Sequence, residues 1–352
     1  MGGIQQDSEI DQYFTGKPVM PTIWRSAVVG LGNIGFLFNL DPKRKGTWSH
    51  VTAYTRCDRT SLVGAVEIDK EKIDLFHKQY PDVPVYITVN DLMKNSSPDI
   101  VSVCTPAGSH FPIVRNILNH RVKAIFCEKP LAETVNDAME LAAECRARGI
   151  TLAVNHTRRW ESNYLYAREL IDQGRIGQVK VVNVLYPAQV FNIGTHIFDV
   201  VRMLIRQDVT MVCAVPPGSD DPDPNMSGWL LFSNKIPCGV LATGKREDLI
   251  FEIDIVGSEG RLRIIENGEV VELYRFEESN RYSGYRELAR LDPGEIEKTD
   301  RFVAAIDDIV AVLDGAKDDV NCTGCDGLAA IQIATALCDS AKNFGRPLAA
   351  GM

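Results

Sequence analysis

A glycine-rich turn near the start of the chain has the residue types and spacing of a dinucleotide-binding site. The sequence Gly30-Leu31-Gly32-Asn33-Ile34-Gly35 follows the apolar run 23–29 and precedes a segment expected to be helical. The first glycine permits a tight turn, the second lets the backbone approach a pyrophosphate, and the third allows close helix–strand contact. Free N–H groups at the helix start would bind the anion. A glycine turn without a ligand is the alternative.

A carboxylate is expected at the end of the second strand, where it would accept hydrogen bonds from the adenosine ribose. Glu67 follows the apolar run 62–66, and Asp69 is a second candidate. Because two acidic groups would repel a 2′-phosphate, NAD is favoured over NADP as the cofactor. Glu67 lies 32 residues after Gly35, whereas the usual spacing is about 20. The surplus, 36–48, is interpreted either as a solvated loop or as a basic lid that meets a phosphate.

Glu128-Lys129-Pro130 follows the apolar run 124–127, at the edge where open α/β sheets bind ligands. A lysine near an apolar strand end and a cationic nicotinamide ring should have a lowered pKa. Such a lysine could exchange a proton with a substrate hydroxyl near neutral pH. By itself, Glu-Lys-Pro is also typical of a surface turn, and a single histidine at a helix start, such as His196, is also typical of a capping or buried residue.

Alternating strands and helices must position these residues. Near-continuous apolar runs separated by helix-like segments are typical of a parallel sheet covered on both faces. We expect strands at 23–29, 61–66, 99–105, 124–127 and 151–154, a weaker strand at 83–88, and helices at 70–79, 111–119 and 134–148. The predicted fold class is therefore α/β, with an N-terminal doubly wound Rossmann domain.

The pattern changes after residue 155, because β segments then dominate. We expect strands at 179–186, 209–215, 229–232, 240–243, 251–256, 261–265 and 270–273, and helices at 161–173, 196–205, 300–313 and 326–343. These elements predict an α+β domain with a large mixed or antiparallel open sheet, with helices on one face and a solvated loop at 218–224. The predicted division is an extension at 1–22, a Rossmann domain at 23–155, and a substrate-binding and oligomerisation domain at 156–352.

Composition narrows the class of protein. Of 352 residues, 45% are hydrophobic and 24% charged, as in ordinary globular proteins of two domains. The net charge of −9 argues against nucleic-acid and anionic-membrane partners. Neither a membrane span nor a signal-peptide core is evident. Nine cysteines, an odd number, favour a reducing cytoplasm over a disulfide framework. Cys322-Thr323-Gly324-Cys325 is interpreted as a turn before a helix, and no metal site is predicted.

Several segments in a fixed order resemble the glucose–fructose oxidoreductase, inositol dehydrogenase and MocA-like (Gfo/Idh/MocA) family of dehydrogenases. They include Gly30–Gly35, Cys104–His110, Glu128-Lys129-Pro130, Asn155–Trp160 and Gly194-Thr195-His196-Ile197-Phe198-Asp199. The similarity extends from about residue 25 to the final helix. The combination of Glu-Lys-Pro with Gly-x-His-x-x-Asp is its most specific part.

On the cofactor side, the resemblance implies roles for residues at the nicotinamide. Thr105, Pro106 and His110 would border the ring. Glu128 would help to hold their loop and the ribose. The bond between Lys129 and Pro130 is expected to be cis, as it often is in the family.

On the substrate side, the resemblance implies that Lys129 contacts the reacting hydroxyl and that His196 lies opposite it as proton donor or acceptor. Arg158 and Asn192 are the further candidates for binding substrate. Sugar-alcohol dehydrogenases of the family often have Asp where this chain has Asn192. Because an amide cannot take up a proton, acid–base work would fall to Lys129 or His196. The short connection 187–193 suggests an open pocket.

These inferences predict an NAD(P)-dependent oxidoreductase that transfers a hydride between nicotinamide and a hydroxyl or keto carbon of a sugar, polyol or nucleotide sugar. One alternative is a reductase of a conjugated, non-sugar substrate. The other is a non-catalytic regulatory protein that retains the NAD-binding domain. A cytoplasmic homo-dimer or homo-tetramer is expected, since relatives usually associate through the open sheet.

Overall fold

The computed structural model describes residues 21–218 and 221–351. The expected N-terminal extension therefore lies, apart from its end, outside the described residues. Within them, none of the helices combines the length and apolar character that crossing a membrane requires.

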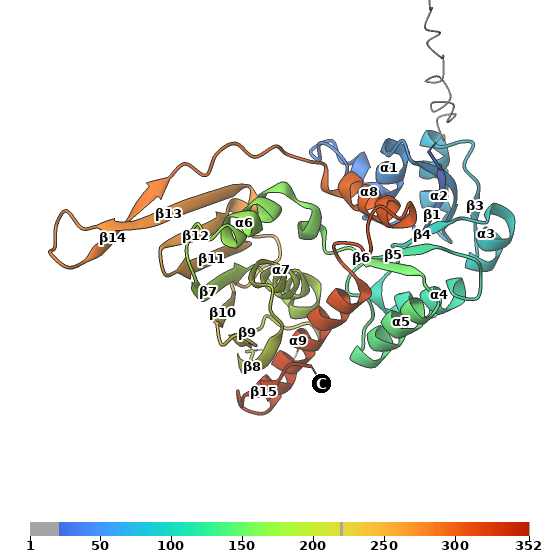
Figure 1. Ribbon diagram of the computed structural model, residues 1–352. Coiled ribbons are helices and arrows are strands. Elements are labelled where there is room, and N and C mark those ends of the chain that lie inside the picture. The colour runs from blue at the N-terminus through green and yellow to red at the C-terminus, as the bar shows by residue number, and fades with distance from the viewer. Residues whose placement is uncertain (1–20, 219–220, 352) are drawn as a thin grey trace, which may run out of the picture.

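The first sheet is a parallel sheet of six strands in the order β3-β2-β1-β4-β5-β6 (Figure 1). Its strands are β1 (Trp24–Val29), β2 (Thr60–Val66), β3 (Val85–Tyr86), β4 (Ile100–Val103), β5 (Ala124–Cys127) and β6 (Thr151–Val154). The strand order reverses between β1 and β4, and this switch point is where doubly wound sheets bind dinucleotides. The predicted Rossmann domain is confirmed.

Five helices follow strands of this sheet: α1 (His50–Arg56), α2 (Lys70–Gln79), α3 (Val89–Ser96), α4 (His110–Ile117) and α5 (Val135–Ala147). The side chains of Ser49, Asp69, Thr88 and Thr134 cap the N-termini of α1, α2, α3 and α5 by accepting backbone N–H bonds. Helices α1 and α3 were not expected from the sequence. Each has only about two turns, too short for apolar periodicity to stand out.

The second sheet has nine strands in the order β14-β13-β12-β11-β7-β10-β9-β8-β15. They are β7 (Val179–Tyr186), β8 (Val209–Val215), β9 (Ser227–Phe232), β10 (Pro237–Ala242), β11 (Glu252–Gly257), β12 (Gly260–Ile265), β13 (Val270–Glu278), β14 (Arg286–Leu291) and β15 (Leu348–Ala349). Only β7 and β10 pair in parallel, so the mixed sheet is confirmed. The unpredicted β14 belongs to a hairpin that projects from the body (Figure 1).

Helices α6 (Ser162–Asp172), α7 (Thr195–Ile205) and α9 (Gly324–Lys342) cover one side of this second sheet (Figure 1). Helix α8 (Arg301–Leu313) instead packs beside α1, and its Phe302, Ile306 and Ile309 belong to the hydrophobic core of the Rossmann domain. The chain therefore returns to its first core near residue 300. Helix α9 joins both cores, through Ile331 in the first and Leu337 in the second.

The other side of the second sheet exposes large apolar side chains. Trp229 and Leu241 are 55% and 52% exposed, and Met211 and Val215 lie on neighbouring β8. Buried and exposed residues alternate along β8 and β9, as expected when only one face packs on helices.

Candidate active site

A cavity of about 1330 Å³ runs along the carboxyl edge of the parallel sheet. The glycine turn and the end of β2 line one end. Lys129 lines the other end, together with Asn192, Asp223 and Arg246 from the second domain. The cavity therefore connects the predicted dinucleotide site with the predicted catalytic lysine.

The geometry of the glycine turn fits a pyrophosphate. Gly30 has a φ of +95°, which side chains rarely adopt. A Cβ on Gly35 would collide with the carbonyl oxygen of Gly30, whereas a Cβ on Gly32 would meet nothing and faces open space. Within the described residues, the N–H groups of Gly32, Asn33 and Ile34 donate to no acceptor, and all three residues line the cavity. These free donors fit phosphate oxygens.

Glu67 lines the same end of the cavity and ties the turn to β2. Its Oε2 accepts the N–H of Leu31 at 2.8 Å, and its Oε1 accepts those of Ile68 at 2.8 Å and Asp69 at 3.0 Å. Asp69 caps α2 and pairs with Lys72 at 3.3 Å. Glu67 thus holds the phosphate-binding turn in place. Its expected contact with a ribose stays a prediction.

The insertion 36–48 is looped out of the helix that follows the glycine turn. The carbonyl of Ile34 accepts the N–H of His50 at 3.1 Å, and the insertion itself contains the 3-10 helix η1 (Leu37–Leu40). Within the insertion, the Arg44 guanidinium lies 4.0 Å from the centre of the Phe38 ring, and Phe38 lines the cavity. The N–H of Thr47 donates to Asp300 at the start of α8. The insertion is therefore anchored on the protein, and its role as a lid stays a prediction.

A buried polar network supports Glu128 from behind. His50 Nε2 lies 2.9 Å from a Glu128 carboxylate oxygen, and its Nδ1 lies 2.8 Å from the hydroxyl of Ser102. Asn155 also donates to Glu128. Burial opposes ionisation of Glu128, but the hydrogen bonds from His50 and Asn155, with the charges of His50 and Lys129, together outweigh it and lower the pKa of the carboxyl. The sequence analysis missed His50, because nothing in its local sequence distinguishes it.

Lys129 lies at the junction of the two domains. Its bond to Pro130 is cis, as expected. Its Nζ donates to the backbone oxygen of Asn192 at 2.7 Å and to its side-chain oxygen at 2.8 Å. Burial lowers the pKa of Lys129 to about 8, Glu128 opposes this shift, and the charges of Arg158 and Arg246 add to it. The lowered pKa predicted from the sequence is therefore present.

The loop after β4 lines the cavity through Thr105 and Pro106, and its expected contact with a nicotinamide ring stays a prediction. His110 lies behind this loop and is 1% exposed. Its ring nitrogens lie 2.8 Å from the carbonyl oxygens of Pro130 and Thr105. His110 thus joins the Thr105 loop to the Lys129-Pro130 segment instead of lining the cavity.

The loop 218–224 is solvated at Gly218, Asp221 and Pro222, as expected, but packs on the protein at its end. Residues 219–220 lie outside the described part, but the Asp223 carboxylate accepts the N–H groups of Phe191 at 2.7 Å and Asn192 at 3.2 Å. Asp223 also lines the cavity. The solvated-loop prediction is wrong at this end, because Asp223 satisfies the backbone of the π-helical turn η4 (Gln189–Gly194). The sequence Asp221-Pro222-Asp223-Pro224 is typical of a solvated turn and does not indicate this contact.

His196 contacts a second histidine. Its Nδ1 lies 3.4 Å from Nδ1 of His156, and the rings are nearly perpendicular. Burial, followed by the charges of Lys129 and Arg158, keeps the pKa of His196 well below its usual range. Among the described residues, His196 makes no hydrogen bond to Lys129, whose Nζ bonds to Asn192. The expected place of His196 opposite Lys129 stays a prediction, since His196 is not among the residues that line the cavity, and the contact with His156 was not expected from the sequence.

The histidine pair should make stability depend on pH. Burial lowers the pKa of His156 to about 4 from its usual 6.5. The folded protein favours the neutral ring, so stability is full above pH 6.5 and falls as acid protonates the unfolded state. When the pH is lowered from 7.5 to 5, His156 should reduce the free energy of unfolding by about 2 kcal/mol. In urea unfolding of His156→Gln, the loss of unfolding free energy between pH 7.5 and 5 should be smaller than in the wild type by that amount. His77→Gln, at an exposed position, should match the wild type, and equal dependence in all three would contradict the assignment.

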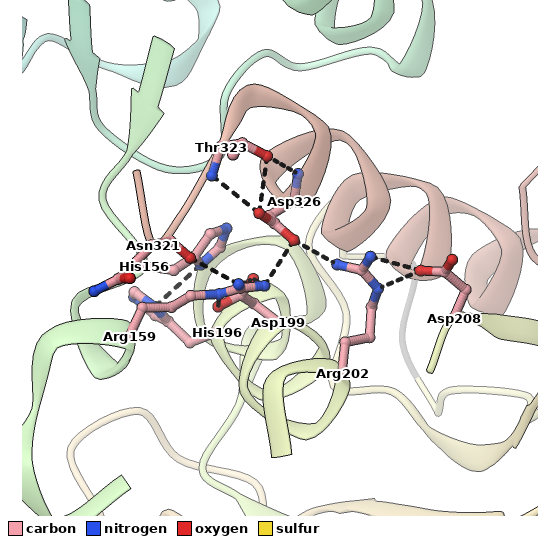
Figure 2. A network of polar contacts seen from close by, with 9 residues as sticks. All are labelled: His156, Arg159, His196, Asp199, Arg202, Asp208, Asn321, Thr323 and Asp326. Atoms are coloured by element: carbon pink, nitrogen blue, oxygen red, sulfur yellow. Dashed lines mark hydrogen bonds and ion pairs between the residues drawn. The ribbon is translucent and has the colours of Figure 1, made fainter. Parts of the chain in front are cut away.

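A buried ion-pair network fixes the segment that contains His156 and Arg159 (Figure 2). Arg159, in the 3-10 helix η3 (Thr157–Trp160), makes a bidentate contact with Asp199 of α7 at 2.7–3.1 Å. It also donates to Asp326 of α9 and to the backbone oxygen of Asn321. Asp326 in turn accepts from Arg202. The Asp of the Gly-x-His-x-x-Asp motif therefore anchors η3 and does not reach the cavity.

Comparison with known proteins agrees with this geometry. Residues 24–156 match the model of an oxidoreductase family with an NAD-binding Rossmann fold, GFO_IDH_MocA. This match supports the resemblance over these residues and confirms the NAD-binding Rossmann domain. An uncharacterised oxidoreductase of Schizosaccharomyces pombe is 31% identical over 160 residues, 46% of this chain and 40% of that protein. The chain thus matches less than half the length of this relative.

Two further proteins cover more of the chain. An inositol 2-dehydrogenase of Rhizobium meliloti is 24% identical over 71% of this chain and 80% of its own length. The structure of an aldose-aldose oxidoreductase from Caulobacter crescentus aligns with 93% of this chain and 99% of its own, with a TM-score of 0.75 and 19% identity. At this identity, the structural likeness shows that the two-domain fold is shared.

Proposed function

We propose that this protein is an NAD-dependent oxidoreductase that interconverts an alcohol and a ketone on a sugar, polyol or nucleotide sugar. The half-buried Lys129, with its pKa lowered to about 8, carries the proposal, because it lies in the same cavity as the glycine turn. An amine that titrates near the working pH is suited to proton exchange with a hydroxyl.

The residues of this chain divide the work between binding and proton transfer. The free N–H groups of the glycine turn would hold the pyrophosphate of the cofactor, whose nicotinamide ring accepts or returns the hydride when bound. Glu67 and Asp69 at the adenosine end favour NAD over NADP, since they would repel a 2′-phosphate. Asn192 of the second domain orients the Lys129 amine by accepting two hydrogen bonds from it. The hydroxyl proton would pass to Nζ.

His196 would act as the second proton-handling group. Because its Nδ1 contacts His156, its Nε2 is the ring nitrogen that remains for a substrate hydroxyl. Its low pKa keeps the ring neutral near pH 7, so it can either donate or accept a hydrogen bond there. His196 thus would orient the hydroxyl whose proton Lys129 receives.

A substrate screen tests the proposed function. Purified protein with NAD⁺ should produce absorbance at the NADH band with a polyol, sugar or nucleotide sugar, and the reaction should run backward with the matching ketone and NADH. Turnover of conjugated non-sugar acceptors alone would support a reductase instead. Tight NAD⁺ binding without turnover of any of these substrates would support a regulatory protein.

We also propose that the protein forms a cytoplasmic homo-dimer or homo-tetramer through the open face of the second sheet. The exposed Trp229, Leu241 and Val215 support this face as the interface. The nine cysteines are all unpaired thiols, which fits a reducing compartment. Light scattering at micromolar concentration should give the mass of a dimer or tetramer. Trp229→Glu should shift it toward the monomer, and a wild type that is purely monomeric would contradict the proposal.

A further inference from the structure

Two arginines without an ion-pair partner among the described residues lie at or near the substrate end of the cavity. Arg246 lines it beside Lys129, and the charge of Arg158 is close enough to lower the pKa of both Lys129 and His196. The carboxylates of Glu128, Glu133 and Asp223 also line the cavity. Asp223 accepts two backbone N–H groups of η4, and Glu128 accepts from His50 and Asn155. None of these carboxylates forms an ion pair with Arg158 or Arg246, so the two guanidinium groups remain available to an anion.

Arg158 differs from the arginine that follows it in the chain. Arg159 has two carboxylate partners, Asp199 and Asp326. Arg158 has no ion pair with any described residue, and its buried Nε has no hydrogen-bond partner. Its guanidinium lies 3.5 Å from the centre of the Phe251 ring. Stacking on a ring fixes the plane of a guanidinium and leaves its edge donors for another group.

Arg246 and Phe251 belong to one segment, 243–251, which connects β10 to β11. The start of this segment is fixed, because the N–H groups of Thr243 and Gly244 donate to the carbonyls of Tyr186 and Pro187 at the end of β7. The segment thus supplies one arginine and the ring on which the second lies. Within the part of the chain that the structure describes, Arg246 also has no carboxylate partner within ion-pair distance.

We propose that the substrate carries an anionic group, a carboxylate or a phosphate, and that Arg158 and Arg246 bind it next to the carbon that reacts at Lys129. This inference rests on the proposed function and narrows its substrate class to acidic sugars. Planar guanidinium groups with free edge donors match the oxygens of both anions. A uronic acid and a sugar phosphate or nucleotide sugar share this chemistry, and the test distinguishes them.

Binding is measured by calorimetry on the protein saturated with NADH, so that turnover is not needed. The probes are D-glucuronate, D-glucose 6-phosphate and D-glucose. At least one anionic probe should bind about 10- to 100-fold more tightly than glucose, the range for hydrogen bonds between charged groups. Its affinity should fall with added salt. Preference for glucuronate indicates a carboxylate, and preference for the phosphate indicates a phosphorylated sugar.

Variants connect the preference with the two arginines. Arg158→Gln and Arg246→Gln should each reduce the anionic preference about tenfold or more. Lys245→Gln is the matched control, since it removes the same charge from an adjacent exposed residue that does not line the cavity. A sugar-independent readout accompanies them: inorganic phosphate, compared with chloride at equal ionic strength, should raise the melting temperature of the wild type more than that of either arginine variant.

The inference is overturned if glucose binds as tightly as both anionic probes, or if phosphate stabilises the wild type and the arginine variants equally. These outcomes are separate from failure of the proposed function. Hydride transfer to NAD⁺ from neutral sugars alone would keep that function and reject the anionic substrate. Arginine-dependent anion binding without any hydride transfer would keep the anion site and reject the function.

Discussion

Turnover should fall by about 10²- to 10⁴-fold when Lys129 is replaced by Met, the range that general acid–base catalysis supplies. Methionine preserves most of the side-chain volume but cannot exchange a proton. Affinity for NAD⁺ should change little, because the free N–H donors of the glycine turn lie at the other end of the cavity. Steady-state kinetics and a fluorescence titration with NADH measure the two effects separately.

The pH profile distinguishes proton exchange from a purely structural role of Lys129. In the wild type, alcohol oxidation should rise with pH to a plateau above about 8, because the neutral amine takes up the proton. Ketone reduction should fall over the same range, because the ammonium form donates it. Lys129→Met should lose the pH dependence of both reactions. Arg246→Gln should shift both pH dependences to higher pH, because removal of a cation raises the pKa of the amine. A variant with wild-type turnover would reject the role.

Stability should fall by about 3 kcal/mol or more when Asp199 is replaced by Asn, because a buried guanidinium then loses its bidentate partner. Asp199 is fully buried and Arg159 nearly so, so water cannot replace the lost contact. Urea unfolding measures the free energy. Asp172→Asn removes a partly exposed partner of Arg206 and serves as the control, with an expected loss below about 1 kcal/mol.

The same substitution should also weaken substrate binding. Arg159 fixes η3, and this short helix follows His156 and contains Arg158. Loosening it should raise KM more than it lowers kcat at temperatures where the variant remains folded. Loss of stability below about 1 kcal/mol would show that Asp326 alone compensates Arg159, and the proposed anchor would then be wrong.

Most of the fold could be predicted because its elements have strong periodic signals. The apolar runs of the parallel sheet and the strand Val179–Tyr186 agree closely with the structure. Short elements were not predicted, because two turns of helix in α1 or six alternating residues in β14 resemble ordinary loop sequence. The packing of α8 on the first core could not be foreseen either, because its sequence records that one face is apolar but not which core that face joins.

The candidate site divides in a similar way. Gly30 and Gly35 are determined by local backbone requirements, so the sequence by itself predicts the phosphate-binding turn. The lowered pKa of Lys129 also followed from its place at a strand end. His50 and His156 contact Glu128 and His196 through the packing of distant segments within each domain, and Arg246 reaches the cavity only through the packing of the two domains. The sequence determined which chemical groups are present and the turn that binds phosphate. Only the tertiary structure decided their partners, because hydrogen bonds, burial and charge act through space between residues far apart in the chain.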